Sequence, residues 1–306
     1  MWEGPSNRSF RKPLPLPKSS QPKLFMAEIT AAAVAKLREM TNAGMMDCKK
    51  ALTEANGDLD KAVDILRKKG AATATTKGTR EAREGVVAQY IAPGRRLGVL
   101  VEVNCQTDFV ARNEMFRAFA DDVAKRLGAD PKTDFEADRV AMVAKIRENI
   151  QIPRHARMEV NGNGMISAYI HTGAKVGVLV EVGAGKETTV AADDFKELVK
   201  DITLQIAAGH PFVVTRDQVP AEVVAKEKEI ASEQVKNKPP QAIAKIVEGK
   251  LEKFYQTYCL VDQGFVKKNE TSVKDHVAAV AKQLGDEITI RRFVRFQVGE
   301  TPAAAS

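Results

Sequence analysis

Residues 85–103, GVVAQYIAPGRRLGVLVEV, recur without a gap as GMISAYIHTGAKVGVLVEV at residues 164–182. Ten of the nineteen positions are identical. Each copy has two alternating apolar runs around a turn that contains Gly94 or Gly173, and this pattern predicts a β-hairpin. The repetition indicates a core that is built twice from one unit.

A helical pattern follows each hairpin at the same offset of 79 residues. Phe116 and Phe119 in the first copy correspond to Phe195 and Leu198 in the second. A hairpin followed by a helix, made twice, predicts the α+β class: a duplicated core of antiparallel sheets with helices packed on them.

The rest of the core is expected to come from segments outside the hairpins. Between the copies, residues 131–160 predict one helix and a short connection. Beyond the second copy, Val273–Leu284 predicts another helix. The run ITIRRFVRFQV (288–298) predicts the strand that completes the second sheet.

Two further helical patterns run from Val219 to Val235 and from Gln241 to Tyr258. Consecutive prolines at 239 and 240 cannot continue a helix, so a protruding antiparallel helical hairpin is predicted. A hairpin of this kind can also serve as a homodimer interface, and self-association stays open at this point.

Residues 26–70 are expected to form a small three-helix module, in which Thr30, Asp47 and Asp58 cap the helices. Gly70 is expected to end the third helix. In chain order the predicted parts are a disordered basic extension (1–25), the three-helix module (26–70), a flexible linker (71–84), core subdomain 1 (85–160), core subdomain 2 (161–218 and 259–300), the helical hairpin (219–258) and a tail (301–306).

The charge of the chain is concentrated at its start. The net charge is +7, and residues 1–25 contribute +4 of it. The remainder is mixed in sign, as a solvated surface is, so we expect no direct contact with nucleic acid. The rival hypothesis from another class is an RNA-binding or ribosome-associated protein that uses the basic extension.

The extension itself has two interpretations, a targeting arm or an upstream start, since Met26 opens a patterned segment. No apolar run is long enough to cross a membrane or to act as a secretory signal, so a cytoplasmic protein is expected. Cys48, Cys105 and Cys259 lack any C-x-x-C spacing and are predicted to be small buried or half-buried thiols.

Catalytic motifs are not found in the sequence. The histidines at 155, 171, 210 and 276 are isolated, and no G-x-S-x-G elbow occurs. GAGKETT (183–189) lacks the spacing of a phosphate loop. We therefore expect neither catalysis nor a cofactor or metal site.

The pair Asp108-Phe109 stands directly after the second strand of the first copy. At the equivalent junction the second copy has GAGKETTV (183–190), so the scaffold itself requires no Asp-Phe pair. Two readings stay open: Asp108 caps the next helix while Phe109 packs beneath it, or the pair is an exposed wedge and a carboxylate that enter a partner's pocket.

From Met26 to about Glu300 the chain resembles the bacterial elongation factor Ts family. The resemblance rests on four stretches: MTNAGMMDCKKALTEANGDLDKAVDILRKKG (40–70), VEVNCQTDFVARNE (101–114), VAMVAKIRENI (140–150) and FVRFQVGE (293–300). The chain has no counterpart of the extra C-terminal helix of some members, so contacts from such a helix are not expected.

The resemblance implies a nucleotide-exchange factor for elongation factor Tu, the GTPase that carries aminoacyl-tRNA. Such a factor binds the GDP form, disturbs its Mg²⁺ site and promotes GDP release so that GTP can rebind. GDP, GTP and Mg²⁺ belong to the partner, and this chain is expected to hold no cofactor. The N-terminal module is implied to be UBA-like, and a homodimer or a 2:2 complex is conceivable through the core and the hairpin.

The resemblance also implies which residues meet the partner. Phe109 would be the wedge and Asp108 would disturb Mg²⁺ coordination, within the turn Thr107–Val110. Some family members have glycine where Arg147 stands. The further contacts implied are Ile146, Arg147, His171 and, in the N-terminal module, Met45, Met46, Asp47, Lys49 and Lys50.

Overall fold

The computed structural model describes residues 29–300 except 42, 79 and 238. The chain divides into two compact units, one up to Leu66 and one from Arg67 onward, and each is described by itself. The predicted basic extension (1–25) and tail (301–306) lie outside the described residues.

The first unit is helical. Its helices are α1 (Ala31–Thr41), α2 (Met45–Glu54) and the first part of α3 (Leu59–Lys77). Apolar residues at helical spacing on the three elements meet in one small core. The buried members of this core are Val34, Leu37, Cys48, Ala51, Leu52, Ala55 and Ala62.

Two of the three predicted helix caps are present. Thr30 Oγ1 and Asp58 Oδ1 each accept a hydrogen bond from a backbone amide three residues on, at 3.2 and 3.1 Å. The prediction for Asp47 is wrong, because α2 already begins at Met45, with Gly44 at the capping position. Asp47 stands instead in the first turn, where a negative charge is favourable to the helix dipole.

The predicted helix end at Gly70 is also wrong, because α3 continues to Lys77 and takes up half of the predicted linker. Gly70 is buried, and a Cβ there would lie 3.1 Å from Cβ of Ala144 in α6 (Glu136–Ile146). The glycine therefore lets two helices approach closely and does not end one of them.

The second unit contains two three-stranded antiparallel sheets of the same design, in the orders β1-β2-β3 and β4-β5-β8. Val86 lies opposite Val103 in the first sheet, and Met165 lies opposite Val182 in the second, which is the same pair 79 residues on. The strands are β1 (Glu84–Ile91), β2 (Leu97–Cys105), β3 (Gln151–Glu159), β4 (Gly164–Ile170), β5 (Val176–Ala184) and β8 (Ile288–Gln297).

Strand β3 replaces the short connection predicted before the second copy. Its sequence, QIPRHARME, is mostly polar, and only Met158 is buried in it. Hydrophobic alternation cannot reveal such a strand, since its place is decided by pairing with β2, far away in the sequence. The predicted role of residues 288–298 is confirmed, because β8 pairs with β5.

The two sheets pack against each other through reciprocal glycines. A Cβ on Gly98 would lie 2.6 Å from Ile166, and a Cβ on Gly177 would lie 2.5 Å from Val87. Gly177 and Ile166 are the equivalents of Gly98 and Val87 at the offset of 79, so each contact is the counterpart of the other. The two copies are therefore related by an approximate two-fold axis. The buried residues between the sheets are Val87, Leu100, Met158, Val160, Ile166, Leu179 and Phe296.

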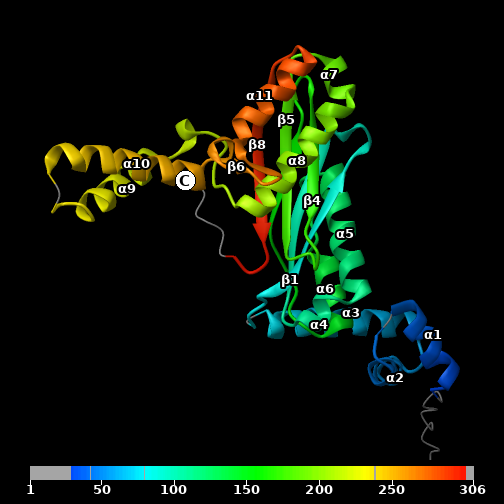
Figure 1. Ribbon diagram of the computed structural model, residues 1–306. Helices are drawn as coiled ribbons and strands as arrows, with labels where there is room; N and C mark the ends of the chain where they lie inside the picture. The colour runs from blue at the N-terminus through cyan, green and yellow to red at the C-terminus, as the bar shows by residue number, and fades with distance from the viewer. Residues whose placement is uncertain (1–28, 42, 79, 238, 301–306) are drawn as a thin grey trace, which may run out of the picture. The chain divides into compact units, whose positions relative to one another are not determined.

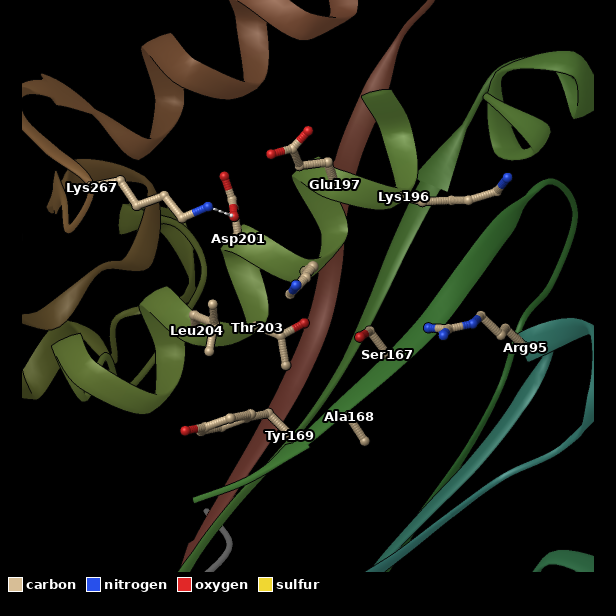
Figure 2. A pocket seen from close by; sticks show the side chains of 11 residues that line it. Arg95, Ser167, Ala168, Tyr169, Lys196, Glu197, Asp201, Thr203, Leu204 and Lys267 are labelled. Atoms are coloured by element: carbon tan, nitrogen blue, oxygen red, sulfur yellow. Dashed lines mark ion pairs between the residues drawn. The ribbon is translucent and has the colours of Figure 1, made fainter. Parts of the chain in front are cut away.

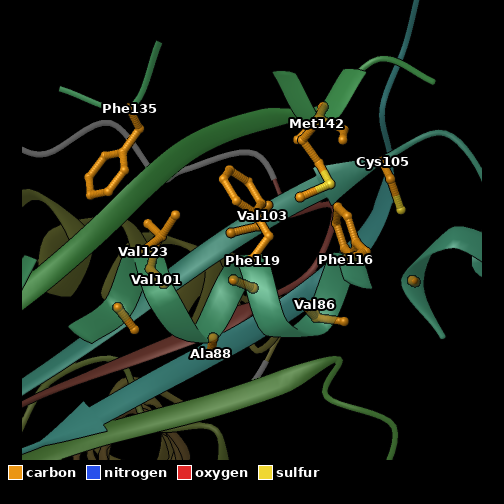
Figure 3. Close-up of a cluster of buried hydrophobic side chains, with 14 of the residues drawn as sticks. Val86, Ala88, Val101, Val103, Cys105, Phe116, Phe119, Val123, Phe135 and Met142 are labelled. Carbon is orange, nitrogen blue, oxygen red and sulfur yellow. The ribbon is translucent and has the colours of Figure 1, made fainter. Parts of the chain in front are cut away.

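Helices cover the outer face of each sheet. Figure 3 shows Phe116 and Phe119 of α5 (Glu114–Ala129) gathered with Val101 and Val103 of β2 and with Met142 of α6. The corresponding core of the second copy joins its sheet to α8 (Asp193–Gly209) and α11 (Val273–Leu284). The order helices, sheet, sheet, helices makes the four layers of the unit.

Each copy buries one glutamate on the central strand of its sheet. Glu102 is 1% exposed and accepts a hydrogen bond from Arg154 Nε at 2.7 Å. Glu181, its equivalent, is 3% exposed and accepts one from Arg292 Nε at 2.7 Å. Both arginines stand opposite their glutamates on the third strand, so the same pairing occurs twice, although the side chain of Arg154 is 16% exposed and that of Arg292 is 53% exposed.

The helical hairpin consists of α9 (Ala221–Glu233) and α10 (Pro240–Tyr258), which lie side by side in Figure 1. Arg216 fixes its base, pairing with Glu252 and Asp262, both at 2.8 Å. The remaining short elements are η1 (Pro93–Arg95), α4 (Asp108–Ala111), α7 (Glu187–Ala191), η2 (Arg216–Gln218), η3 (Leu260–Asp262), β6 (Gly264–Phe265) and β7 (Lys268–Ser272). The predicted α+β class, with N-terminal helices, duplicated antiparallel sheets and a helical hairpin, is confirmed.

Candidate functional site

The Asp-Phe pair lies on a tight turn where β2 passes into α4. Thr107 has an extended backbone at the capping position, and its Oγ1 accepts a hydrogen bond from the Val110 amide at 3.4 Å. Asp108 and Phe109 are the first two residues of the four-residue helix that follows. A rigid strand therefore leads directly into the pair.

The structure rules out the first of the two readings of this pair. Thr107, and not Asp108, caps α4. Phe109 does not pack beneath the helix, because it is 82% exposed. Leaving a phenylalanine in water forgoes ~1.5 to 3 kcal/mol of burial energy, so the exposed ring contributes little to the stability of this turn.

The Asp108 carboxylate is oriented by its neighbour Arg112, one helical turn on. Arg112 Nη2 lies 2.9 Å from Asp108 Oδ2, and both side chains are substantially exposed. An exposed pair of this kind contributes ~0 to 1 kcal/mol. A partner that offers a better cation can therefore take the carboxylate from Arg112 at little cost.

Glu148 holds the turn from the side. Its Oε2 accepts hydrogen bonds from the amides of Gln106 and Thr107, both at 3.0 Å, and its Oε1 accepts one from Thr107 Oγ1 at 2.7 Å. These bonds join residues more than forty positions apart, so no local sequence signal reveals them. Sequence reasoning missed Glu148 for that reason.

Cys105 supports the same turn from within the core. Its Sγ donates to the Thr107 carbonyl at 3.2 Å. Burial, together with the nearby Glu148 carboxylate, raises the pKa of the thiol to about 12, so the donor proton stays in place at neutral pH. All three cysteines are buried and free, as predicted.

The predicted contacts Ile146 and Arg147 lie beside the turn because Glu148 follows them directly. Ile146 is half-buried against the first core, while Arg147 is exposed. Arg147 ends α6 in the left-handed conformation, with φ 65°. Glycine adopts this conformation without strain, so a glycine at this position is compatible with the fold.

His171 lies in the turn between β4 and β5 and is exposed, with Nδ1 3.0 Å from the hydroxyl of Tyr169. Lys175 of the same turn pairs with Glu84, and Glu84 stands opposite Cys105 at the end of β2. The turn that carries His171 therefore reaches the same end of the first sheet as the Asp-Phe pair. Residues predicted from separate stretches meet at this end of the second unit.

The predicted contacts of the first unit lie on α2. Met45 and Met46 are 60% and 62% exposed, and Lys49 and Lys50 are also exposed. Asp47 is half-buried. Exposed methionines beside lysines make an adaptable apolar surface with a positive rim. Met40 of α1 is 55% exposed as well.

The second unit also has an open pocket of about 600 Å³ beside β4 and α8 (Figure 2). Lys267 pairs with the buried Asp201 at 2.6 Å, and Lys196 pairs with Asp193 at 2.8 Å. Two of the lysines that line the pocket are therefore already paired with carboxylates.

Among the described residues, no cluster of three or more His, Cys, Asp or Glu side chains could hold a metal ion. Nor is any helix in the described part long and apolar enough to cross a membrane.

Comparisons with known proteins agree with one another. A family model described as elongation factor TS matches residues 106–300, starting at the turn that carries the Asp-Phe pair. Several curated relatives are named elongation factor Ts. The one from Symbiobacterium thermophilum is 46% identical over 284 residues, which cover 90% of this chain and 93% of the relative. The relative from Nostoc sp. is 41% identical over 293 residues, covering 90% and 94%. That from Chloroherpeton thalassium is 42% identical over 294 residues, covering 90% and all of the relative.

Proposed function

This chain belongs to the elongation factor Ts family, and on that premise we propose that it is the guanine-nucleotide exchange factor of elongation factor Tu. It binds the GDP form of that GTPase, disturbs the Mg²⁺ site and promotes release of GDP, so that GTP can rebind. The chain is not itself an enzyme in this proposal. GDP, GTP and Mg²⁺ are held by the partner, and no cofactor is assigned to this chain.

The observation that carries the proposal is the exposure of Phe109 on an ordered turn. Aromatic side chains that fill a partner's pocket contribute ~2 kcal/mol or more to an interface. Speeding up GDP release a thousandfold requires ~4 kcal/mol of barrier lowering. One aromatic wedge, together with a charge effect at the metal, is of the right size.

Asp108 supplies the charge effect. Its carboxylate stands next to the wedge and is paired with the exposed Arg112 in the free protein. When the ring of Phe109 enters the partner, Asp108 is brought toward the residues that hold Mg²⁺. A carboxylate there would repel the anionic ligands of the ion or compete with them for it, and the hold of Mg²⁺ on GDP would weaken.

Exchange also requires that the factor leave again. By linkage, a factor that weakens GDP and Mg²⁺ binding must itself be bound less tightly when nucleotide and Mg²⁺ return. A small wedge that competes for the same site fulfils this condition, because it and the metal cannot both be accommodated. The proposal therefore predicts a complex that is tight without nucleotide and weak with it.

The remaining contacts are assigned to positioning the wedge on the partner. Ile146, Arg147 and His171 flank the turn at the same end of the second unit. The exposed face of α2 in the first unit docks separately on the GTPase domain. The residues proposed for that face are Met45, Met46, Asp47, Lys49 and Lys50.

Stopped-flow release of a fluorescent GDP from elongation factor Tu at millimolar Mg²⁺ tests the proposal. The wild-type chain is expected to accelerate release, and Phe109→Ala and Asp108→Ala to lose most of the acceleration. The matched control is Phe212→Ala, because Phe212 is also a well-exposed phenylalanine, 67% exposed, on another part of the unit. No acceleration by the wild type would refute the exchange function, and equal rates for Phe109→Ala and Phe212→Ala would refute the wedge.

A further inference from the structure

We propose that Glu148 is the residue that positions the wedge: its carboxylate locks the turn before α4 and so presents Phe109 and Asp108 in one orientation. This inference rests on the exchange function proposed above and adds a residue to it. Glu148 does not need to touch the partner in order to act. Its role is to keep the turn ordered in the free protein.

The clamp uses both oxygens of the Glu148 carboxylate as acceptors. The carboxylate of Glu148 receives three hydrogen bonds, from two consecutive amides and one hydroxyl, at 3.0, 3.0 and 2.7 Å. Hydrogen bonds to an ionised group are stronger than neutral ones. Because the two amides belong to Gln106 and Thr107, the residues directly before Asp108, the clamp sets the direction in which α4 begins.

Glu148 is itself held on both sides. The left-handed Arg147 before it ends α6 through a hydrogen bond from its amide to the Val143 carbonyl at 2.8 Å. Asn149 after it is fully buried and donates from Nδ2 to the Arg80 carbonyl at 2.6 Å. A residue fixed by its neighbours in this way can orient the turn instead of following it.

The second copy contains the same device without a wedge. There α11 ends at Gly285, also left-handed with φ 59°, and the next residue, Asp286, accepts a hydrogen bond from the Lys186 amide at 2.9 Å. Lys186 is the equivalent of Thr107 at the offset of 79. The clamp is therefore part of the duplicated scaffold, and only the first copy places an exposed aromatic after it.

The repeat separates a general structural role from a positioning role. Removing either clamp should loosen one strand-to-helix turn, but only the turn of the first copy carries Phe109. A wedge that is free to rotate presents its ring correctly in a smaller fraction of encounters. Misplacement by about 1 Å can reduce a rate by up to ~100-fold, so we expect about a tenfold loss or more.

The experiment compares three variants of the full chain. Glu148→Ala removes the clamp. Glu148→Gln is the conservative variant, since the amide oxygen can accept from both backbone amides and the NH₂ group can donate to the Thr107 hydroxyl. Asp286→Ala is the matched control in the second copy. The readouts are the maximal rate of fluorescent GDP release at saturating factor and amide hydrogen exchange of residues 104–112 and of the equivalent residues 183–191.

The expected result is that Glu148→Ala loses the protection of the Thr107 amide and lowers the maximal release rate by about tenfold or more. Glu148→Gln should recover most of both. Asp286→Ala should leave the release rate unchanged, although it exposes the Lys186 amide to exchange.

Three results would overturn the inference. The first is a release rate of Glu148→Ala equal to that of Asp286→Ala. The second is unchanged protection of the Thr107 amide in Glu148→Ala. The third is a Glu148→Gln variant with wild-type protection but the rate of Glu148→Ala, which would mean that the carboxylate acts on the partner directly. A wild-type chain that fails to accelerate release sinks the exchange function instead, and amide exchange then judges the clamp alone.

Discussion

Replacing Phe109 with alanine should leave the stability of the second unit almost unchanged. The ring is 82% exposed, so folding removes only about a fifth of a side-chain surface of ~200 Å², or roughly 40 Å², from water. At ~25 cal/mol per Å², the variant loses at most about 1 kcal/mol. Phe116, which is fully buried in the first core, is the matched comparison, and its truncation should cost about 3 to 5 kcal/mol.

Thermal unfolding followed by far-UV circular dichroism measures the difference. For a unit of this size, 1 kcal/mol corresponds to about 2 to 4 °C in Tm. Phe109→Ala should therefore lower Tm by about 4 °C at most, and Phe116→Ala by roughly 6 to 20 °C. Equal losses in the two variants would show that the ring of Phe109 is packed in solution, and the wedge would lose its physical basis.

Four further predictions concern stability, thiol chemistry and assembly. Glu102→Ala should destabilise the second unit by about 3 to 5 kcal/mol in urea unfolding, because it leaves the largely buried Arg154, 16% exposed, without its carboxylate partner; a loss below about 1 kcal/mol would contradict this. Arg147→Gly should raise the free energy of unfolding by up to about 1 kcal/mol, since it removes left-handed strain at a position where the second copy already has Gly285. The folded pKa of Cys105 is raised to about 12 from 9.0, so its contribution to stability is complete below pH 9 and is lost as the pH rises toward 12. A thiol reagent at pH 8 should accordingly leave Cys105 unmodified in the folded protein and modify it after unfolding. If the helical hairpin mediates self-association, light scattering should report a smaller particle once residues 219–258 are replaced by a short loop, and an unchanged number of protomers would exclude that interface.

Hairpins of the core were predictable because their contacts are local. Each pair of strands is joined by a short turn, so the alternation of apolar residues and the turn glycine lie within one short stretch. The repeat then confirms the reading, because two sequences with different details keep the same pattern. The caps at Thr30 and Asp58 were readable for the same reason, since the bond joins residues three positions apart.

Features that depend on distant partners could not be read in this way. Gly70 looks like a helix end in sequence, whereas its role is set by Ala144 on another helix. Strand β3 has few apolar residues and is defined by its pairing with β2. The cap predicted at Asp47 lies three positions after the actual one, because the capping residue of α2 is Gly44, which has no side chain to form a capping hydrogen bond.

Some features of the candidate site could be predicted from the sequence, and others required the tertiary structure. From the sequence alone, the repeat shows that Asp108 and Phe109 are not demanded by the scaffold, because the second copy does without them. The tertiary structure alone decides that Phe109 points into solvent, that Thr107 is the cap and that Glu148 holds the turn. The physical reason is that a sequence records local propensity and periodicity directly, while burial and long-range hydrogen bonds exist only once distant segments have come together.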